Sequence, residues 1–299
     1  MKTIHLIHNP GAGDEAHSKT TLLRLIEAAG YECRYCSTDD KEWQNIDPKV
    51  DFIVIAGGDG TVKEVASVLL RKVYSVRRLP VAILPCGTAN NIAESLNIKG
   101  ELIDIIRSWS LAQTTAIDVG EIFNVEEEPD FFIESFGYGL FPYLMKEMEK
   151  SKKDDIEDKD EKMKAALETM YTISNSYKPH YCELVIDGED HSGEFLMAEV
   201  MNTRFIGPNL FLSPHGHPGD GTFEVVLIPG EDQEKFAAYI ESKLNDAEVV
   251  EYTFITIKAE DIQIKWKGTH VHVDDSVIDL KENAPVHVRV QKNAFVFLI

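Results

Sequence analysis

The feature that most constrains this chain is an apolar run, Phe52–Ala56, that leads directly into Gly57-Gly58-Asp59-Gly60-Thr61 and then into a helical pattern near Val62–Lys72. A short, continuous apolar run of this kind is typical of a buried strand in a parallel sheet. Glycines at the junction let the backbone approach a ligand closely, and the N-terminus of the following helix presents free N–H groups to an anion. The segment therefore predicts an α/β domain with a phosphate-binding loop.

Asp59 makes this loop chemically more specific. A carboxylate repels phosphate unless a cation lies between them, so its presence predicts either Mg²⁺ or a hydroxyl group that is to be activated. Thr61 is placed to cap the helix or to contact a phosphate through its hydroxyl. An ordinary Asp-Gly turn is the alternative, but turns seldom use three glycines at a strand-to-helix junction.

Two further loops of the same kind follow strand patterns. Asn9-Pro10-Gly11-Ala12-Gly13 follows the predicted strand Thr3–His8, and Pro85-Cys86-Gly87-Thr88 follows the predicted strand Val81–Leu84. A helical pattern begins after the second loop, at Ala89-Asn90-Asn91. Because the carboxyl ends of parallel strands lie along one edge of a sheet, we expect all three loops to face a single crevice. No Walker-type motif and no Gly-x-Gly-x-x-Gly after the first strand is present.

The pattern changes near Asp118, after which strand-like runs dominate. They predict a second, mainly antiparallel β domain over residues 119–285, after an α/β domain over residues 1–118. The runs are Phe131–Phe136, Tyr181–Ile186, Glu194–Met201, Thr222–Ile228, Val250–Ile257, Ile262–Trp266, Val271–Val273 and Val286–Val290. The segment Lys146–Lys164 is dense in charge, which is typical of a solvated helix or loop, with a substrate-gating lid as the alternative.

The charge balance limits the partners. Asp and Glu number 51 against 30 Lys and Arg, a formal net charge of −21. Such a chain is not expected to bind nucleic acid, since phosphate binding depends largely on Lys and Arg. Its contact with a membrane surface is expected to be transient. Neither a secretory signal nor an apolar stretch near the roughly 20 residues of a membrane span is visible, so we expect a cytoplasmic protein.

Several motifs together resemble the diacylglycerol kinase catalytic-domain family, which includes bacterial soluble lipid kinases and sphingosine kinases and is distantly similar to NAD kinases. The matching stretches, in chain order, are Asn9-Pro10, Gly57–Thr61 with Glu64, Gly87–Asn90, Ile117–Gly120, Gly137–Gly139, Asn202, Ser213-Pro214, Asp220-Gly221 and Val273-Asp274. The resemblance implies an α/β nucleotide-binding domain, a β-sandwich domain for the lipid substrate, and an active site between them. It also implies that the strands at about 286–299 return to the first domain.

The resemblance further implies ATP- and Mg²⁺-dependent phosphorylation of a hydroxyl of diacylglycerol or a related lipid. Asp59 and Asp118 match acidic residues near the phosphates and the catalytic metal. Asp220 matches a second Mg²⁺ site, which the backbone carbonyls of His217 and Thr222 are expected to complete. The positions that match ATP contacts are Asn9, Pro10, Gly11, Gly13, Thr38, Gly57, Gly58, Asp59, Gly60, Thr61, Glu64, Gly87, Thr88 and Asn90.

On the acceptor side, Asp274 is the leading candidate for orienting or deprotonating the hydroxyl, with Asp275 and Ser276 beside it. Ser276 departs from the family, which has Glu there, and an uncharged Ser cannot take a proton without a base of its own. Asn91 and Phe141 also stand where the family has Asp. These departures motivate one alternative, a nucleotide- or lipid-binding homologue with weak or no catalysis. The similarity to NAD kinases motivates another, a kinase of a soluble acceptor.

Overall fold

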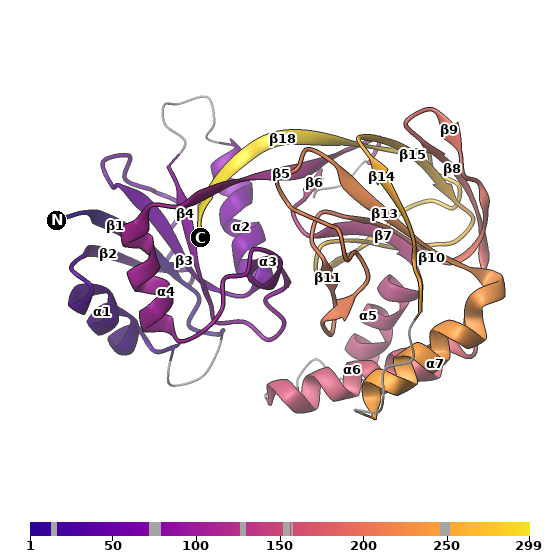
Figure 1. Ribbon diagram of the computed structural model, residues 1–299, viewed down its shortest axis with the longest axis horizontal. Coiled ribbons are helices and arrows are strands. Elements are labelled where there is room, and N and C mark those ends of the chain that lie inside the picture. Colours follow the sequence, from indigo (N-terminus) through magenta and orange to yellow (C-terminus); the bar gives the residue numbers. More distant parts are fainter. Residues whose placement is uncertain (13–16, 72–78, 126–129, 152–155, 157, 246–251) are drawn as a thin grey trace. The chain divides into compact units, whose positions relative to one another are not determined.

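The computed structural model describes residues 1–12, 17–71, 79–125, 130–151, 156, 158–245 and 252–299 (Figure 1). Its contacts divide the chain into two compact units, each described below by itself. The first unit comprises Met1–Asp118 and Lys292–Ile299, and the second comprises Val119–Gln291. The chain therefore rejoins the first unit at Lys292.

A parallel sheet forms the centre of the first unit. Its strands are β1 (Thr3–His8), β2 (Glu32–Ser37), β3 (Phe52–Gly57) and β4 (Val81–Pro85). They pair in parallel in the order β4-β3-β1-β2. At the far side of β4, Phe297 near the end of β18 (Val286–Leu298) pairs in parallel with Val81. Every residue of β3 is buried, as the continuous apolar run predicted.

Helices cover both faces of this sheet (Figure 1). They are α1 (Lys19–Ala28), α2 (Asp59–Arg71), α3 (Asn91–Ser95), α4 (Leu102–Ser108) and the 3-10 helix η2 (Trp109–Leu111). α1 packs against α4 and buries Leu22 and Ile26, whereas α2 packs against β3 from the other face. Ser18 caps α1 by accepting the N–H of Thr21, which fixes the start of the helix at Lys19.

The second unit is a β-sandwich. Its strands are β5 (Thr114–Phe123, which begins in the first unit), β6 (Phe131–Phe132), β7 (Ser135–Gly139), β8 (His180–Ile186), β9 (Glu189–Asp190), β10 (Gly193–Met201), β11 (Phe205–Ile206), β12 (Leu210–Phe211), β13 (Phe223–Pro229), β14 (Ile255–Ala259), β15 (Asp261–Trp266), β16 (His270–Val273), β17 (Ser276–Asp279) and the first part of β18.

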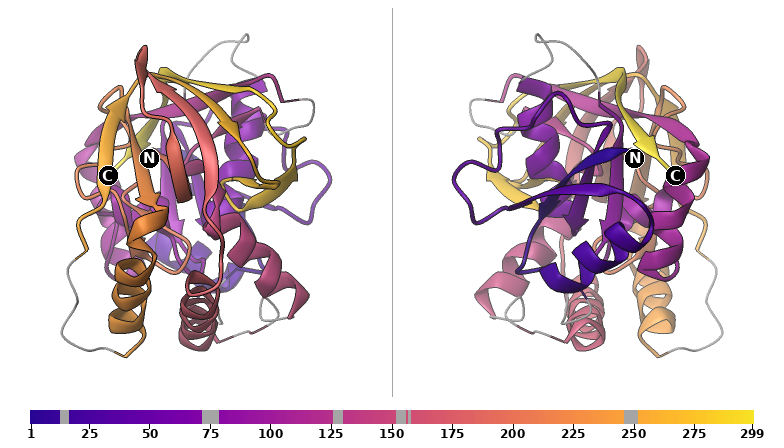
Figure 2. Two further views of the ribbon diagram at one scale, coloured as in Figure 1. Left: turned by 90° about the vertical axis from the view of Figure 1, so that its right-hand side faces the viewer. Right: turned by 90° about the vertical axis from the view of Figure 1, so that its left-hand side faces the viewer.

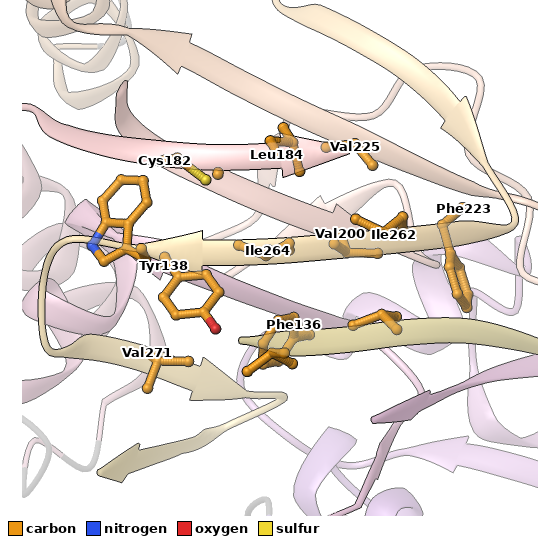
Figure 3. Close-up of a cluster of buried hydrophobic side chains, with 14 of the residues drawn as sticks. Phe136, Tyr138, Cys182, Leu184, Val200, Phe223, Val225, Ile262, Ile264 and Val271 are labelled. Carbon is orange, nitrogen blue, oxygen red and sulfur yellow. The ribbon is translucent and has the colours of Figure 1, made fainter. Parts of the chain in front are cut away.

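Strand β10 belongs to both layers of the sandwich. From Met197 onward it lies between β7 and β13 in the order β17-β16-β7-β10-β13-β14, while its first residues pair with β8, which continues to β15 and β18. A break in register between Phe195 and Met197 marks the change of partner. Apolar side chains from both layers meet in the interior, among them Phe136 and Val271 from one layer and Ile264 from the other (Figure 3).

This unit also has three α-helices and one 3-10 helix in its described part, of which only the stretches within the charged segment 146–164 were expected as a helix or loop. They are α5 (Leu140–Lys150), α6 (Lys159–Ser174), η4 (Gly230–Asp232) and α7 (Gln233–Leu244). α6 and α7 lie side by side (Figure 2, left), and a second apolar cluster joins the helices to the outer face of β10 and β13. The charged segment 146–164 contains the end of α5 and the start of α6, and residues 152–155 and 157 lie outside the described part.

The predicted fold class, a parallel α/β domain followed by an antiparallel β-sandwich, is confirmed. Among the described helices, none is long and apolar enough to cross a membrane.

Candidate active site

The structure brings the three predicted loops of the first unit together. We refer to residues 9–11, 57–61 and 87–90 as the glycine-loop cluster. Asn9 follows β1, and its side-chain amide donates to Thr61 Oγ1 at 3.0 Å. Its backbone N–H donates to the carbonyl of Ala56 at 2.9 Å, and its side-chain oxygen accepts the N–H of Gly11 at 2.9 Å. Asn9 thereby ties the first loop to the second, because β1 and β3 are neighbours in the sheet.

Gly58 and Gly87 are packed directly against each other. A Cβ on Gly87 would lie 2.4 Å from Gly58 Cα, and a Cβ on Gly58 would lie 3.0 Å from Gly87 Cα. Only glycine at both positions allows this approach of two backbones. Asn90, in the left-handed region at φ 55°, closes the third loop by donating to the carbonyl of Gly87 at 2.9 Å and accepting its N–H at 2.8 Å.

Asp59 joins the second loop to the third. Its carboxylate accepts the backbone N–H of Asn91 at 2.9 Å and that of Ile92 at 3.0 Å, one on each oxygen. Helix α3 therefore begins on the Asp59 side chain rather than on a cap of its own, since Asn90 makes no side-chain cap bond. Asn91 occupies the position where the family has Asp, and it is buried.

The first residues of α2 lie inside the cluster. α2 begins at Asp59, so its first-turn N–H groups lack acceptors within the helix. These donors and the positive end of the helix dipole favour an anion at this point. A Cβ on Gly57 would lie 2.5 Å from Thr61 Cβ, so glycine there leaves room for the buried Thr61 side chain.

The remaining predicted nucleotide contacts are distributed around the cluster. Thr38 follows β2 and donates its N–H to the carbonyl of His8 at 2.9 Å, which places it beside the end of β1. Pro10 and Thr88 are exposed within their loops, and Glu64 is exposed on α2. Gly60 is partly buried in the first turn of α2. Gly13 lies outside the described residues.

Asp118 is fixed by the returning end of the chain. It lies on β5, is 1% exposed, and accepts the backbone N–H of Asn293 at 2.7 Å. Residue 293 belongs to the last part of β18, so a residue far along the sequence holds this carboxylate in place.

The acids of the first unit suit a hard cation that is bound together with phosphate. No group of three or more His, Cys, Asp or Glu side chains placed to hold a metal occurs among the described residues. Mg²⁺ commonly takes one or two carboxylates together with phosphate oxygens and water, rather than a cage made by protein alone. Asp59 and Asp118 are the carboxylates of this unit that match the family's acidic positions, and backbone N–H groups hold both of them in place.

In the second unit, Asp274 lies at the centre of a backbone network. Its carboxylate accepts the N–H groups of Ile133, Glu134 and Ser135 at 2.8 to 3.2 Å, and its own N–H donates to the carbonyl of Ser135 at 2.8 Å. The residue is 7% exposed and has φ 52°, an unusual backbone conformation outside glycine. These bonds to three backbone N–H groups hold the carboxylate in place.

Asp275 and Ser276 follow Asp274 and are both exposed. The Ser276 hydroxyl donates to Asp275 Oδ1 at 3.4 Å. Phe141, at the third departure from the family pattern, is on α5 and belongs to the second apolar cluster, with its ring edge-on to His272 at 4.8 Å between centroids. An ionised Asp would be costly in this apolar environment.

The turn 217–222 contains the predicted second metal site. Asp220 Oδ1 accepts both the N–H and the hydroxyl of Thr222, and Oδ2 lies 3.1 Å from the ammonium of Lys258 on β14. Partial burial opposes ionisation, but the bonds from Thr222 and Lys258 lower the pKa of Asp220. The His217 carbonyl accepts the N–H of Asp220 at 3.2 Å. The metal role of this turn stays a prediction, and a cation there would have to displace the Lys258 ammonium.

Sequence reasoning did not identify a buried pair in the second unit, Glu199 and His272. His270 and His272 are two residues apart in the sequence, but the structure gives the two histidines different partners. His270 Nδ1 lies 3.3 Å from the Tyr177 hydroxyl, whereas His272 Nε2 lies 2.8 Å from Glu199 Oε2. The signal that could have found the pair is a single acid, Glu199, within the apolar run 195–201.

Comparison with known proteins agrees with this architecture. Residues 3–122 match the family model for the diacylglycerol kinase catalytic domain, and residues 152–298 match that of the YegS C-terminal NAD kinase beta sandwich-like domain. The chain is 25% identical over 281 residues to a Bacillus subtilis (strain 168) protein named diacylglycerol kinase, covering 88% of this chain and 86% of the relative. A Staphylococcus aureus (strain Newman) protein with a provisional lipid-kinase name is 28% identical over 225 residues, 74% of this chain and 69% of the relative.

A solved structure from Bacillus anthracis str. Sterne has the same fold. It superposes with a TM-score of 0.74 at 21% sequence identity, over 99% of this chain and 97% of that one.

Proposed function

Because the chain belongs to the diacylglycerol kinase catalytic-domain family, we propose that it is an ATP- and Mg²⁺-dependent lipid kinase that phosphorylates a hydroxyl of diacylglycerol or a related lipid. The observation that carries the proposal is the contact of three loops from three neighbouring strands, with Gly58 against Gly87 at its centre. A soluble acceptor is less favoured, because the family relatives are named as lipid kinases.

On the donor side, the glycine-loop cluster holds the phosphates of ATP. The first-turn N–H groups of α2 supply donors and a positive dipole end, and the Thr61 hydroxyl adds a further polar contact. Phosphoryl transfer depends mainly on positioning and on neutralising charge, which preformed backbone donors do at little reorganisation cost. The hydrogen bonds between Asp59 and the start of α3 hold the second and third loops in fixed positions relative to each other during turnover.

Asp59 and Asp118 are the residues that would hold Mg²⁺, which when bound offsets the negative charge of the phosphates. Their hydrogen bonds to backbone N–H groups fix the direction of each carboxylate in advance. Preorganised ligands of this kind are the protein's contribution to a metal site.

On the acceptor side, the second unit contributes the turn 274–276. We assign Asp274 to positioning, because backbone N–H groups occupy its carboxylate. Asp275 is exposed in the same turn and is the candidate to orient or deprotonate the acceptor hydroxyl, with Ser276 hydrogen-bonded to it. The absence of Glu at residue 276 leaves Asp275 to serve in its place.

A second candidate function is a nucleotide- or lipid-binding protein with weak catalysis. The occupied carboxylate of Asp274 and the uncharged Ser276 favour it. The two candidates share ATP binding and differ in turnover.

The test is ADP production by the purified protein with ATP and Mg²⁺, across diacylglycerols, monoacylglycerols, sphingoid bases and NAD in mixed micelles. Lipid-dependent turnover that disappears without Mg²⁺ supports the kinase. Asp118→Asn should abolish it, whereas Asp104→Asn on the exposed surface of α4 is the matched control in the same unit. ATP binding by calorimetry without turnover on any acceptor would favour the binding protein instead.

A further inference from the structure

Glu199 and His272 form a buried hydrogen-bonded pair inside the second unit. Glu199 lies on β10 and His272 on β16, and both side chains are 0% exposed. Glu199 Oε2 and His272 Nε2 are 2.8 Å apart. Strand β7 lies between β10 and β16, so the two side chains meet across the face of β7. Met197 and Met201, which share a face of β10 with Glu199, belong to the apolar cluster under the helices.

Gly137 on β7 makes this meeting possible. In the register of the sheet, Gly137 is paired with Glu199 on one side and with His272 on the other. A Cβ on Gly137 would lie 1.9 Å from Glu199 Oε2, within the space that the carboxylate occupies. Any other residue at 137 would therefore separate the pair.

The hydrogen bonds fix how protons are distributed. His272 Nδ1 lies 2.7 Å from the carbonyl oxygen of Asp274, which can only accept, so Nδ1 carries a hydrogen. A single proton then remains between Nε2 and Glu199 Oε2. Burial raises the pKa of Glu199. Burial by itself would lower the pKa of His272, but the neighbouring Glu199 carboxylate raises it above its usual value. Within the described part of the chain, the Asp274 carboxylate is a second negative group that raises the pKa of His272.

Stability alone does not account for this pair. Buried ion pairs often contribute no more than apolar residues of similar size, because desolvation offsets their attraction. Here Glu199 Oε1 is buried and has no hydrogen-bond partner among the described residues, which adds to the cost. The hydrogen bond that leads out of the pair goes to the backbone of Asp274, whose carboxylate in turn holds residues 133–135.

We propose that Glu199 and His272 are positioning residues, which hold the backbone of Asp274 and through it the acceptor-side turn 274–276. The route runs from the Glu199 carboxylate to the His272 ring, then to the Asp274 carbonyl and the exposed Asp275. The catalytic part of this inference rests on the proposed kinase function, whereas the structural part does not.

The experiment separates positioning from stability. The double variant Glu199→Met with His272→Leu replaces the pair with apolar groups, which restores a dry, uncharged interior even where either single variant fails to fold. Glu199→Gln is the conservative variant, because its amide can donate to Nε2 of a neutral His272 whose Nδ1–H still reaches Asp274. The matched control is Ser213→Ala with Glu224→Met, which removes another buried polar pair of this unit, 2.5 Å apart.

Hydrogen exchange at the amides of 133–135 gives a readout independent of activity, since the Asp274 carboxylate accepts these N–H groups. In the double variant we expect exchange there to accelerate by about tenfold or more. We expect kcat with lipid to fall by roughly 10- to 100-fold, since displacements near 1 Å have such effects. The KM for ATP should stay within about twofold, and the control and Glu199→Gln should keep the protection of 133–135.

A folded double variant with unchanged exchange at 133–135 and unchanged kcat would overturn the proposal, and so would loss of protection in Glu199→Gln equal to that in the double variant. Absence of lipid turnover in the wild-type protein would remove the proposed kinase function, but the exchange measurement would still decide whether the pair holds the turn.

Discussion

Replacing Gly87 by Ala tests the contact at the centre of the glycine-loop cluster. The new Cβ would lie 2.4 Å from Gly58 Cα, 3.2 Å from Gly58 N and 2.8 Å from Asn90 Oδ1. Ordinary van der Waals contact begins near 3.4 Å, so the two loops would have to separate by about 1 Å. Two of these three atoms belong to the backbone of Gly58, which cannot relieve the clash by rotating to another rotamer as a side chain can.

The expected loss follows from this displacement. Overpacking of this kind costs about 1–3 kcal/mol of stability. Moving one N–H donor away from a charged phosphate loses about 1.5–3 kcal/mol of binding. Because 1.4 kcal/mol corresponds to a tenfold change in affinity, we expect ATP to bind roughly 10- to 100-fold more weakly.

Calorimetric titration with ATP, together with thermal unfolding, measures both effects. Gly30→Ala is the matched control, because residue 30 has φ 86° and a Cβ there would meet no described atom within 4 Å beyond its chain neighbours. Its backbone strain costs about 1–2 kcal/mol of stability. Both variants should unfold at lower temperature, but only Gly87→Ala should lose ATP affinity. A folded Gly87→Ala protein that binds ATP within twofold of the wild type would refute the reasoning.

Three further predictions follow from the side-chain contacts. Asp59→Asn should lower lipid turnover at least 100-fold, and undiminished turnover would contradict its proposed role at the metal. It should also destabilise the first unit by about 1–3 kcal/mol, because an amide group would face the α3 N–H donors, and unchanged stability would contradict its role in holding α3. Lys258→Met removes the ammonium beside Asp220, so MgCl₂ should raise the melting temperature more in this variant than in the wild type; equal shifts would count against a cation site in the turn. The folded Glu199–His272 pair keeps a proton that the unfolded chain releases above about pH 6.5. The free energy of unfolding should therefore fall as the pH rises past that value, by up to about 1.4 kcal/mol per pH unit. Denaturant titrations at a series of pH values measure this dependence, and the free energy should fall less steeply with pH in the apolar double variant.

Local patterns in the sequence predicted much of the first unit. The run 52–56 became β3 (Phe52–Gly57), and Thr3–His8 was predicted with its observed bounds. A buried parallel strand and its glycine junction have a signature within a few residues, so no long-range information is needed. The helices of the second unit were missed for the converse reason. α6 has only a weak apolar stripe and begins in a run of charges, so its sequence indicates a solvated segment.

The sequence by itself determined which residue types stand at the ends of the strands, and with them the phosphate-binding chemistry of the glycine loops. The tertiary structure alone decided what each acid contacts. Asp59 supports α3, Asp118 holds residue 293, and Asp274 holds residues 133–135. A sequence pattern shows that a carboxylate is present, but hydrogen-bond donors that lie far along the chain reach it only through the pairing of strands. For the same reason Glu199 and His272 became a pair only when β7, with glycine at 137, was placed between them.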